Sequence, residues 1–75
     1  MSINRYSYQE LSKKALSDSA TQEDVNNLGQ WFDLYGMDFW NGKCFSIDSE
    51  HDLYPIYAPA DNDQYDIIGY EIRNS

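Results

Sequence analysis

The spacing of apolar residues changes at Gly36, and this change restricts the fold more than any other feature of the 75-residue chain. Before Gly36, apolar residues recur every three or four positions, as they do along one face of an α-helix. After it, short runs of β-branched and aromatic residues alternate with turn-forming residues, which is typical of β-strands. The length suits one domain only, so we expect a single α+β domain over residues 1–75.

The first helix is predicted to begin at Ser7. Ser7-Tyr8-Gln9-Glu10 has the form of a capping box, in which the Ser7 hydroxyl and the Glu10 carboxylate each satisfy a free backbone amide. We expect this helix to end near Asp18. Its apolar stripe comprises Tyr8, Leu11, Ala15 and Leu16.

The second helix is predicted to begin after Thr21 and to end at Gly36. Thr21 is a favoured residue before a first helical turn, and the acids that follow it suit the positive end of the helix dipole. Glycine is a common residue after a last turn. The stripe of this helix comprises Val25, Leu28, Trp31, Phe32 and Tyr35. Because the linker between the helices is short, we expect an antiparallel helical hairpin.

Three short strands are predicted after the helices, over residues 44–47, 53–58 and 67–73. Asn41-Gly42 is a strong tight-turn pair ahead of the first strand. Pro55 lacks a backbone N–H, so the second strand is expected to lie at an edge or to start after a break. Short loops favour an antiparallel sheet, and we expect the two-helix hairpin to pack on one face of it, in the order ααβββ.

Two Trp, three Phe and seven Tyr supply the material for a dense core in this short chain. Cys44 is the single cysteine, so no internal disulfide is available. The first residues contain no long apolar run of the kind found in signal peptides. We therefore expect a soluble, cytoplasmic protein that folds without a disulfide or a metal ion.

The net charge of −8 is unevenly distributed along the chain. Through Ser17 there are three basic residues and one acid, a net +2, whereas the remainder holds two basic residues and twelve acids, a net −10. Such a field opposes binding to nucleic acid or to an anionic membrane and favours association with basic surfaces.

The sequence contains no recognisable catalytic motif. Nucleophile elbows, phosphate-binding loops and dinucleotide-binding fingerprints are absent from it. We interpret His51 as a solvated loop residue and Cys44 as a small buried hydrophobe. The sequence therefore predicts a protein that is not an enzyme and uses no cofactor.

Two acidic stretches have some features of cation sites. Residues 48–52 hold three carboxylates on alternate positions together with His51. Residues 61–66 resemble the start of an EF-hand loop, but Asp66 stands where that loop needs Gly, and Ile72 stands where it needs Glu. We interpret both stretches as solvated loops and expect no metal site.

The excess of carboxylates suggests a binding role. A row of carboxylates imitates the charge of DNA and can occupy a protein groove lined with Lys and Arg. The candidate acids are Glu23, Asp33, Asp38, Asp48, Glu50, Asp52, Asp61, Asp63 and Asp66. Exposed aromatic residues offer an alternative, a protein-interaction or regulatory module unrelated to nucleic acid, in which Trp40 and Tyr57 are the candidate contacts.

Five stretches carry a resemblance to a known class of proteins: Ala20-Thr21-Gln22-Glu23-Asp24-Val25, Leu28-Gly29-Gln30-Trp31-Phe32, Trp40-Asn41-Gly42, Leu53-Tyr54-Pro55-Ile56-Tyr57 and Gly69-Tyr70-Glu71-Ile72. Together they resemble small acidic proteins of phages and mobile elements, of the anti-CRISPR or antirestriction type. The resemblance implies an inhibitor of a host defence nuclease or surveillance complex that occupies its nucleic-acid channel. It carries no shared catalytic residues.

The leading hypothesis is therefore an inhibitor of a bacterial defence system. It binds a basic, nucleic-acid-binding protein or complex of the host through an acidic, DNA-mimicking face, and it binds neither nucleic acid nor a membrane directly. A homodimer, formed through the uncovered sheet face or through the strand edge at Pro55, is left open by the sequence.

Overall fold

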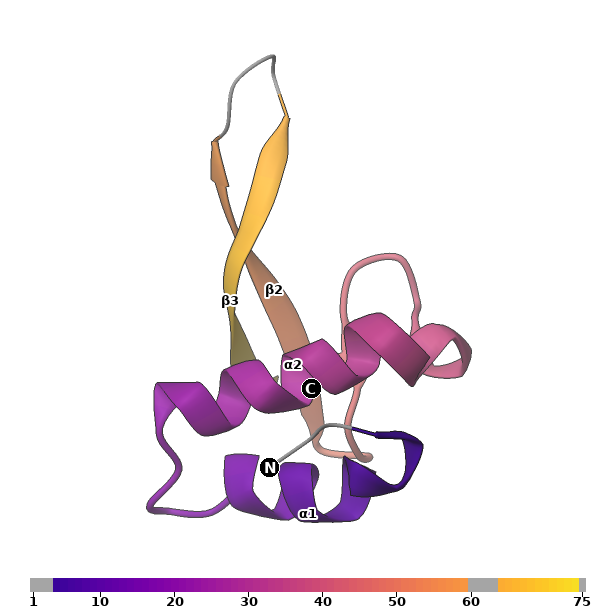
Figure 1. The fold of residues 1–75 in the computed structure, drawn as a ribbon, viewed down its shortest axis with the longest axis vertical. Coiled ribbons are helices and arrows are strands. Elements are labelled where there is room, and N and C mark those ends of the chain that lie inside the picture. The colour runs from indigo at the N-terminus through magenta and orange to yellow at the C-terminus, as the bar shows by residue number, and fades with distance from the viewer. Residues whose placement is uncertain (1–3, 60–63, 75) are drawn as a thin grey trace.

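The helical first half of the chain packs against a sheet formed by the second half (Figure 1). The computed structural model describes residues 4–59 and 64–74. In chain order the elements are η1 (Arg5–Ser7), α1 (Tyr8–Ala15), α2 (Gln22–Tyr35), η2 (Gly36–Phe39), β1 (Phe45–Ser46), β2 (His51–Pro59) and β3 (Tyr65–Asn74). The sheet is antiparallel with strand order β1-β2-β3, which confirms the predicted ααβββ arrangement.

The capping box predicted at Ser7 and Glu10 is wrong. The helical turns begin earlier, at η1, where the Tyr6 N–H donates to Asn4 Oδ1 (2.8 Å) and the Asn4 N–H donates to Ser7 Oγ (3.3 Å). Ser7 is thus already helical and buried, and its hydroxyl serves Asn4. The first α-helix also ends at Ala15, before the predicted end near Asp18.

The predicted start of α2 is confirmed. The Asp24 N–H donates to Thr21 Oγ1 (3.2 Å), and the Thr21 N–H donates to Asp24 Oδ2 (3.0 Å). Gly36 follows the last turn as predicted, but its φ of −90° is not left-handed. Its small size matters instead, because a Cβ there would lie 2.7 Å from the Phe32 ring.

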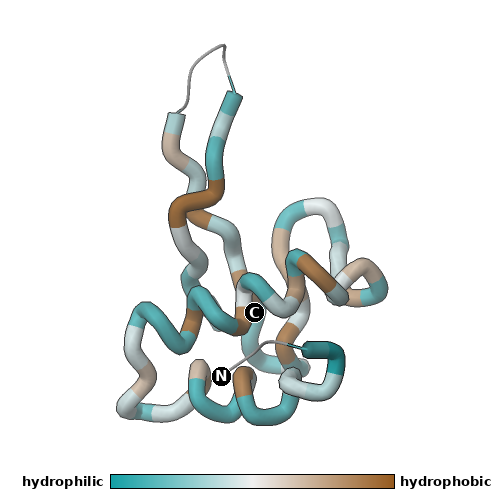
Figure 2. Tube along the Cα trace, in the orientation of Figure 1, coloured by the Kyte–Doolittle hydropathy of each residue, from teal (hydrophilic) through white to brown (hydrophobic). Residues whose placement is uncertain are grey.

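α2 lies between α1 and the sheet, and the core forms on both of its sides. The largest fully buried side chains are Leu11 of α1, Leu28 and Phe32 of α2, and Leu53 of β2. The β2–β3 hairpin continues past α2 and projects from the helices (Figure 1). We call residues 57–59 and 64–68 the hairpin arm. Figure 2 shows that hydrophobic segments extend into this projecting part.

Tyr70 of β3 is the point at which the sheet meets α2. Its ring is buried against the helix backbone, because a Cβ added at Gly29 would lie 2.1 Å from the Tyr70 ring. The Tyr70 N–H donates to Asn26 Oδ1 (3.1 Å), and its carbonyl accepts from Gln22 Nε2 (2.7 Å). Since β3 is an outer strand of the sheet, these two side chains satisfy polar groups on its free edge.

The same arrangement explains how Pro55 is tolerated in β2, which is the central strand by order. Pro55 pairs with Tyr70, whose polar backbone atoms both face α2, so the pair is a non-hydrogen-bonded one. The Pro55 nitrogen then faces the opposite side. The pairing of β1 with β2 extends only as far as Phe45↔Leu53, so beyond Leu53 the edge of β2 that faces away from β3 is unpaired among the described residues. The expected edge position is therefore correct only for the part of β2 beyond Leu53.

Replacing Gly29 with Ala should destabilise the protein, although Ala is the better helix former. The added methyl group overlaps the Tyr70 ring, and overpacking of this kind costs about 1–3 kcal/mol. Urea unfolding followed by Trp fluorescence measures the change. Gln30→Ala, an exposed neighbour on the same helix, should change stability by less than about 0.5 kcal/mol. A Gly29→Ala variant as stable as the parent protein would show that Tyr70 does not dock here.

Candidate binding surface

An apolar groove lies between the base of the hairpin arm, the second half of α2 and the segment that follows this helix. It has a volume of about 250 Å³. The residues that line it are Phe32, Asp33, Met37, Trp40, Phe45, Pro55, Tyr57, Ile67 and Tyr70. Of the residues predicted from the sequence to bind a partner, the structure therefore brings together Asp33, Trp40 and Tyr57.

Trp40 is held in one wall of the groove by a turn and by a chain of aromatic contacts. Asn41 Oδ1 accepts hydrogen bonds from the backbone N–H groups of residues 43 (3.0 Å) and 44 (2.9 Å), and Gly42 adopts a φ of +90°. This turn pairs Trp40 with Phe45. The Trp40 ring lies 4.7 Å from the Phe45 ring, which stacks on buried Phe32 at 4.9 Å. Trp40 is thus anchored to the core while 42% of it stays exposed.

The hairpin arm forms the opposite wall. A bulge shifts the register between the pairs Ile56↔Gly69 and Tyr57↔Ile67, which leaves Ile68 as the extra residue. Tyr57 and Ile67 line the groove, yet each is about half exposed. Ile68 and Tyr65 are about two-thirds exposed. The arm therefore presents apolar side chains that the described part of the chain does not cover.

A second, more polar hollow of about 250 Å³ adjoins the groove, and we call it the amide hollow. Its lining residues are Asn26, Gln30, Asp33, Ile67, Ile68, Gly69 and Tyr70. The two hollows share Asp33, Ile67 and Tyr70. Burial raises the pKa of Tyr70 above its ordinary value, and the nearby Asp33 carboxylate and Tyr57 raise it further.

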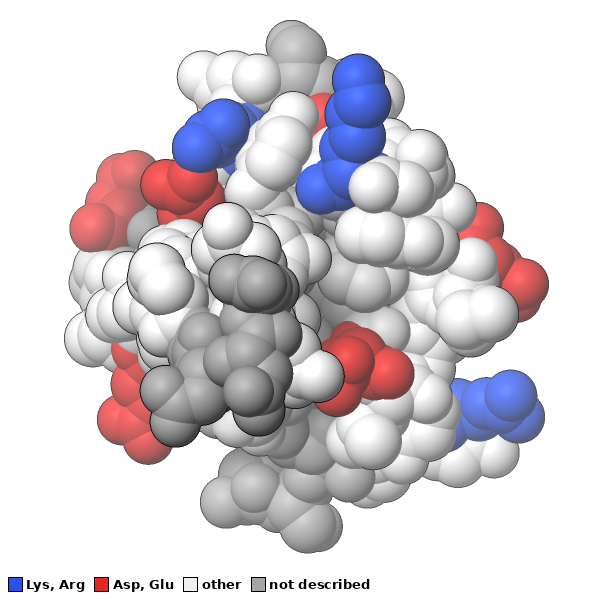
Figure 3. Space-filling view, turned by 90° about the horizontal axis from the view of Figure 1, so that it is seen from above, with Lys and Arg blue, Asp and Glu red and all other residues white. Residues whose placement is uncertain are grey.

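The other predicted acids do not gather at the groove. Glu23 lies in the first turn of α2, Asp38 in η2, Asp48 and Glu50 before β2, and Asp52 and Asp66 in the hairpin, whereas Asp61 and Asp63 fall outside the described residues. Asp66 pairs with Ala58, six positions along β2 from Asp52, so these two acids are separated by about 20 Å. In the view of Figure 3 the acids form several separate groups and no continuous acidic face is seen.

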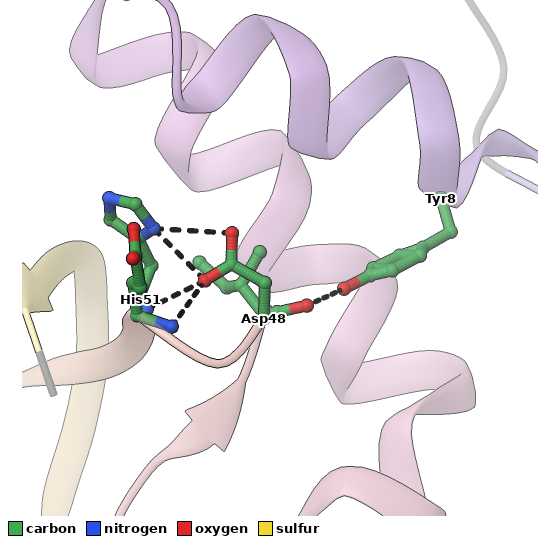
Figure 4. A network of polar contacts seen from close by, with 5 residues as sticks. Tyr8, Asp48 and His51 are labelled. Atoms are coloured by element: carbon green, nitrogen blue, oxygen red, sulfur yellow. Dashed lines mark hydrogen bonds and ion pairs between the residues drawn. The ribbon is translucent and has the colours of Figure 1, made fainter.

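Asp48 has a structural role in the turn before β2 (Figure 4). Its Oδ1 accepts from the N–H groups of Glu50 and His51, both at 2.8 Å, and lies 3.0 Å from His51 Nδ1. Tyr8 secures the same turn by donating its hydroxyl to the Ile47 carbonyl (2.7 Å). The backbone N–H of Glu50 and the His51 side chain hold the pKa of Asp48 below its usual range. In the described residues no group of three or more His, Cys, Asp or Glu side chains is arranged to hold a metal ion.

The groove residues that sequence reasoning missed are Phe32, Met37, Phe45, Pro55, Ile67 and Tyr70. All of them except Met37 belong to predicted helices or strands whose apolar residues equally suit the core, and Met37 lies between two predicted elements, so no local signal marks any of them as a groove residue. Their place in the groove follows from the docking of the sheet on α2.

Neither described helix is long and apolar enough to cross a membrane. Cys44 is a free, buried thiol. Comparison of the chain with models of protein families, with curated proteins and with solved structures finds no match. The resemblance to anti-CRISPR and antirestriction proteins therefore stays a prediction.

Asp48 should make the stability of the protein sensitive to acid. Because its folded-state pKa is lowered, its contribution is present above the ordinary Asp pKa of about 4 and is lost as pH falls through the folded value. Asp48→Asn should therefore lose less stability than the parent protein between pH 6 and pH 2.5, as measured by urea unfolding. Asp38→Asn is the matched control, since it removes an exposed carboxylate outside this turn. An unchanged pH profile for Asp48→Asn would contradict the role assigned to Asp48.

Proposed function

We propose that this protein acts by binding a partner protein and that the apolar groove is its docking surface. One observation carries the proposal: large apolar side chains around a single hollow remain exposed. Met37 is 84% exposed, Trp40 42% and Tyr57 53%. Exposed apolar surface of this kind is a marker of protein interaction sites, and Trp and Tyr are enriched among the residues that dominate binding energy.

The construction of the groove also supports binding. Trp40 is fixed through Phe45 and Phe32 to the core, so little side-chain freedom is lost when a partner covers it. The ionisable side chains that line the groove are Asp33, Tyr57 and Tyr70. This set offers no nucleophile with an adjacent base, which favours recognition over catalysis. The buried thiol of Cys44 is compatible with a reducing compartment, and we place the interaction in the cytoplasm.

A second candidate is the inhibitor of a bacterial defence system that docks an acidic, DNA-mimicking face on a basic host protein. The observation that favours it is the net charge of −8 together with the exposure of six of the seven described candidate acids. The two proposals differ in what dominates affinity. In the first, apolar contact sets the dissociation rate, whereas in the second, charge sets the association rate and its dependence on salt.

Replacing the groove aromatics should weaken binding to the partner. The partner is identified by retention from a bacterial lysate at low and high salt, and its affinity is then measured with purified components. Trp40→Ala and Tyr57→Ala should each raise Kd at least about tenfold, because each removes a large anchored contact. Tyr6→Ala is the matched control, since Tyr6 is 89% exposed and lies outside the groove. Wild-type affinity in both groove variants would overturn the proposed function.

Neutralising acids outside the groove tests the second candidate. The combined variant Glu23→Gln, Asp38→Asn, Glu50→Gln and Asp66→Asn removes four exposed carboxylates and keeps Asp48, which holds its turn. If the inhibitor proposal is correct, association with the same partner should slow by about tenfold or more at low salt and lose most of its salt dependence. Unchanged association kinetics would rule out a charge-mimicking mechanism and leave the apolar groove as the binding determinant.

A further inference from the structure

We propose that the groove recognises a segment of the partner protein in which a basic side chain, Lys or Arg, lies next to an apolar one. The apolar side chain occupies the groove, and the basic one enters the amide hollow and pairs with Asp33. This inference rests on the proposed function and adds the chemistry of the partner to it.

Asp33 stands at the junction of the two hollows. It lines both of them, and no Lys, Arg or other carboxylate of the described chain lines either. The described residues form no hydrogen bond or ion pair to its carboxylate, which is exposed. Among the described residues that line the two hollows, Asp33 therefore carries the only charge. Its effect reaches Tyr70, whose raised pKa has Asp33 as its second cause after burial.

The amide hollow suits the remainder of a basic side chain. Ile67 and Ile68 supply apolar surface on which the alkyl stem of Lys or Arg can lie. The Gln30 side chain is exposed beside Asp33 and offers a carbonyl acceptor for a second donor of a guanidinium. Asn26 Oδ1 already accepts from the Tyr70 N–H and from Gln22 Nε2, so it fixes the floor of the hollow and leaves recognition to its neighbours.

The net charge of the chain favours a basic partner segment over a second copy of the chain as the occupant of the groove. Two copies, each with a net charge of −8, repel one another, whereas a basic segment is attracted over several ångströms at moderate salt. The five basic residues of the chain line neither hollow; they are Arg5, Lys13, Lys14, Lys43 and Arg73. A partner segment that carries Lys or Arg is therefore the occupant that the surface favours.

Selection of a phage-displayed random peptide library on the intact protein tests this inference. Peptides retained by the parent protein and lost with Trp40→Ala should be enriched in Lys or Arg next to an aliphatic or aromatic residue. Synthetic copies of these peptides should bind Asp33→Asn about fivefold or more weakly. Replacing their Arg with citrulline, which keeps the shape and removes the charge, should cause the same loss. Asp18→Asn is the matched control, since Asp18 is exposed and lines neither hollow, and it should bind them as the parent protein does.

Four results would overturn the inference. Trp40-dependent peptides without a basic residue, or with an affinity that Asp33→Asn leaves unchanged, would refute the basic partner while upholding the groove as a binding surface. Failure to retain any Trp40-dependent peptide would count against both proposals. A dimer in analytical ultracentrifugation that dissociates on Trp40→Ala would show that a second copy occupies the groove.

Discussion

The docking of Tyr70 on the backbone of α2 at Gly29 is the contact on which the rest of this structure depends. It joins the sheet to the helices over a distance that permits no side chain at position 29. The hydrogen bond that Gln22 donates to the Tyr70 carbonyl and the one that Asn26 accepts from the Tyr70 N–H fix the orientation of the sheet, because they use the free backbone groups of an outer strand. Packing alone would allow β3 to slide along the helix, whereas these directional bonds select one register.

The position of the hairpin arm follows from this contact. Once Tyr70 is fixed, the strands beyond it leave the helices, and the bulge at Ile68 sets how the arm presents its apolar residues. In a chain this short the helices are not long enough to cover the whole hairpin. Apolar surface thus remains exposed beside α2, where Asp33 is the one carboxylate among the described residues that line the groove.

The core and the proposed binding surface are connected by a continuous series of aromatic contacts. Phe32 is fully buried, Phe45 stacks on it, and Trp40 lies on Phe45 at the edge of the groove. Such continuity keeps the exposed ring in place and reduces the entropy lost on binding. The acids have different roles in the structure: Asp24 caps α2, Asp48 accepts hydrogen bonds that hold a turn, and Asp33 lines the groove.

The sequence by itself determined the order and type of the elements, because the forces responsible act between near neighbours. The Thr21 cap and the Asn41-Gly42 turn each lie within a few residues, and they are where the sequence placed them. The cap at Ser7 was misplaced because Asn4 competes for the same hydroxyl. Only the tertiary structure decided that Asp33, Trp40 and Tyr57 share one groove, since contacts between residues far apart in the chain bring them together. A buried aromatic residue and an exposed one occur in the same local sequence pattern. Which of the aromatic residues stay exposed is decided only when the sheet docks on α2.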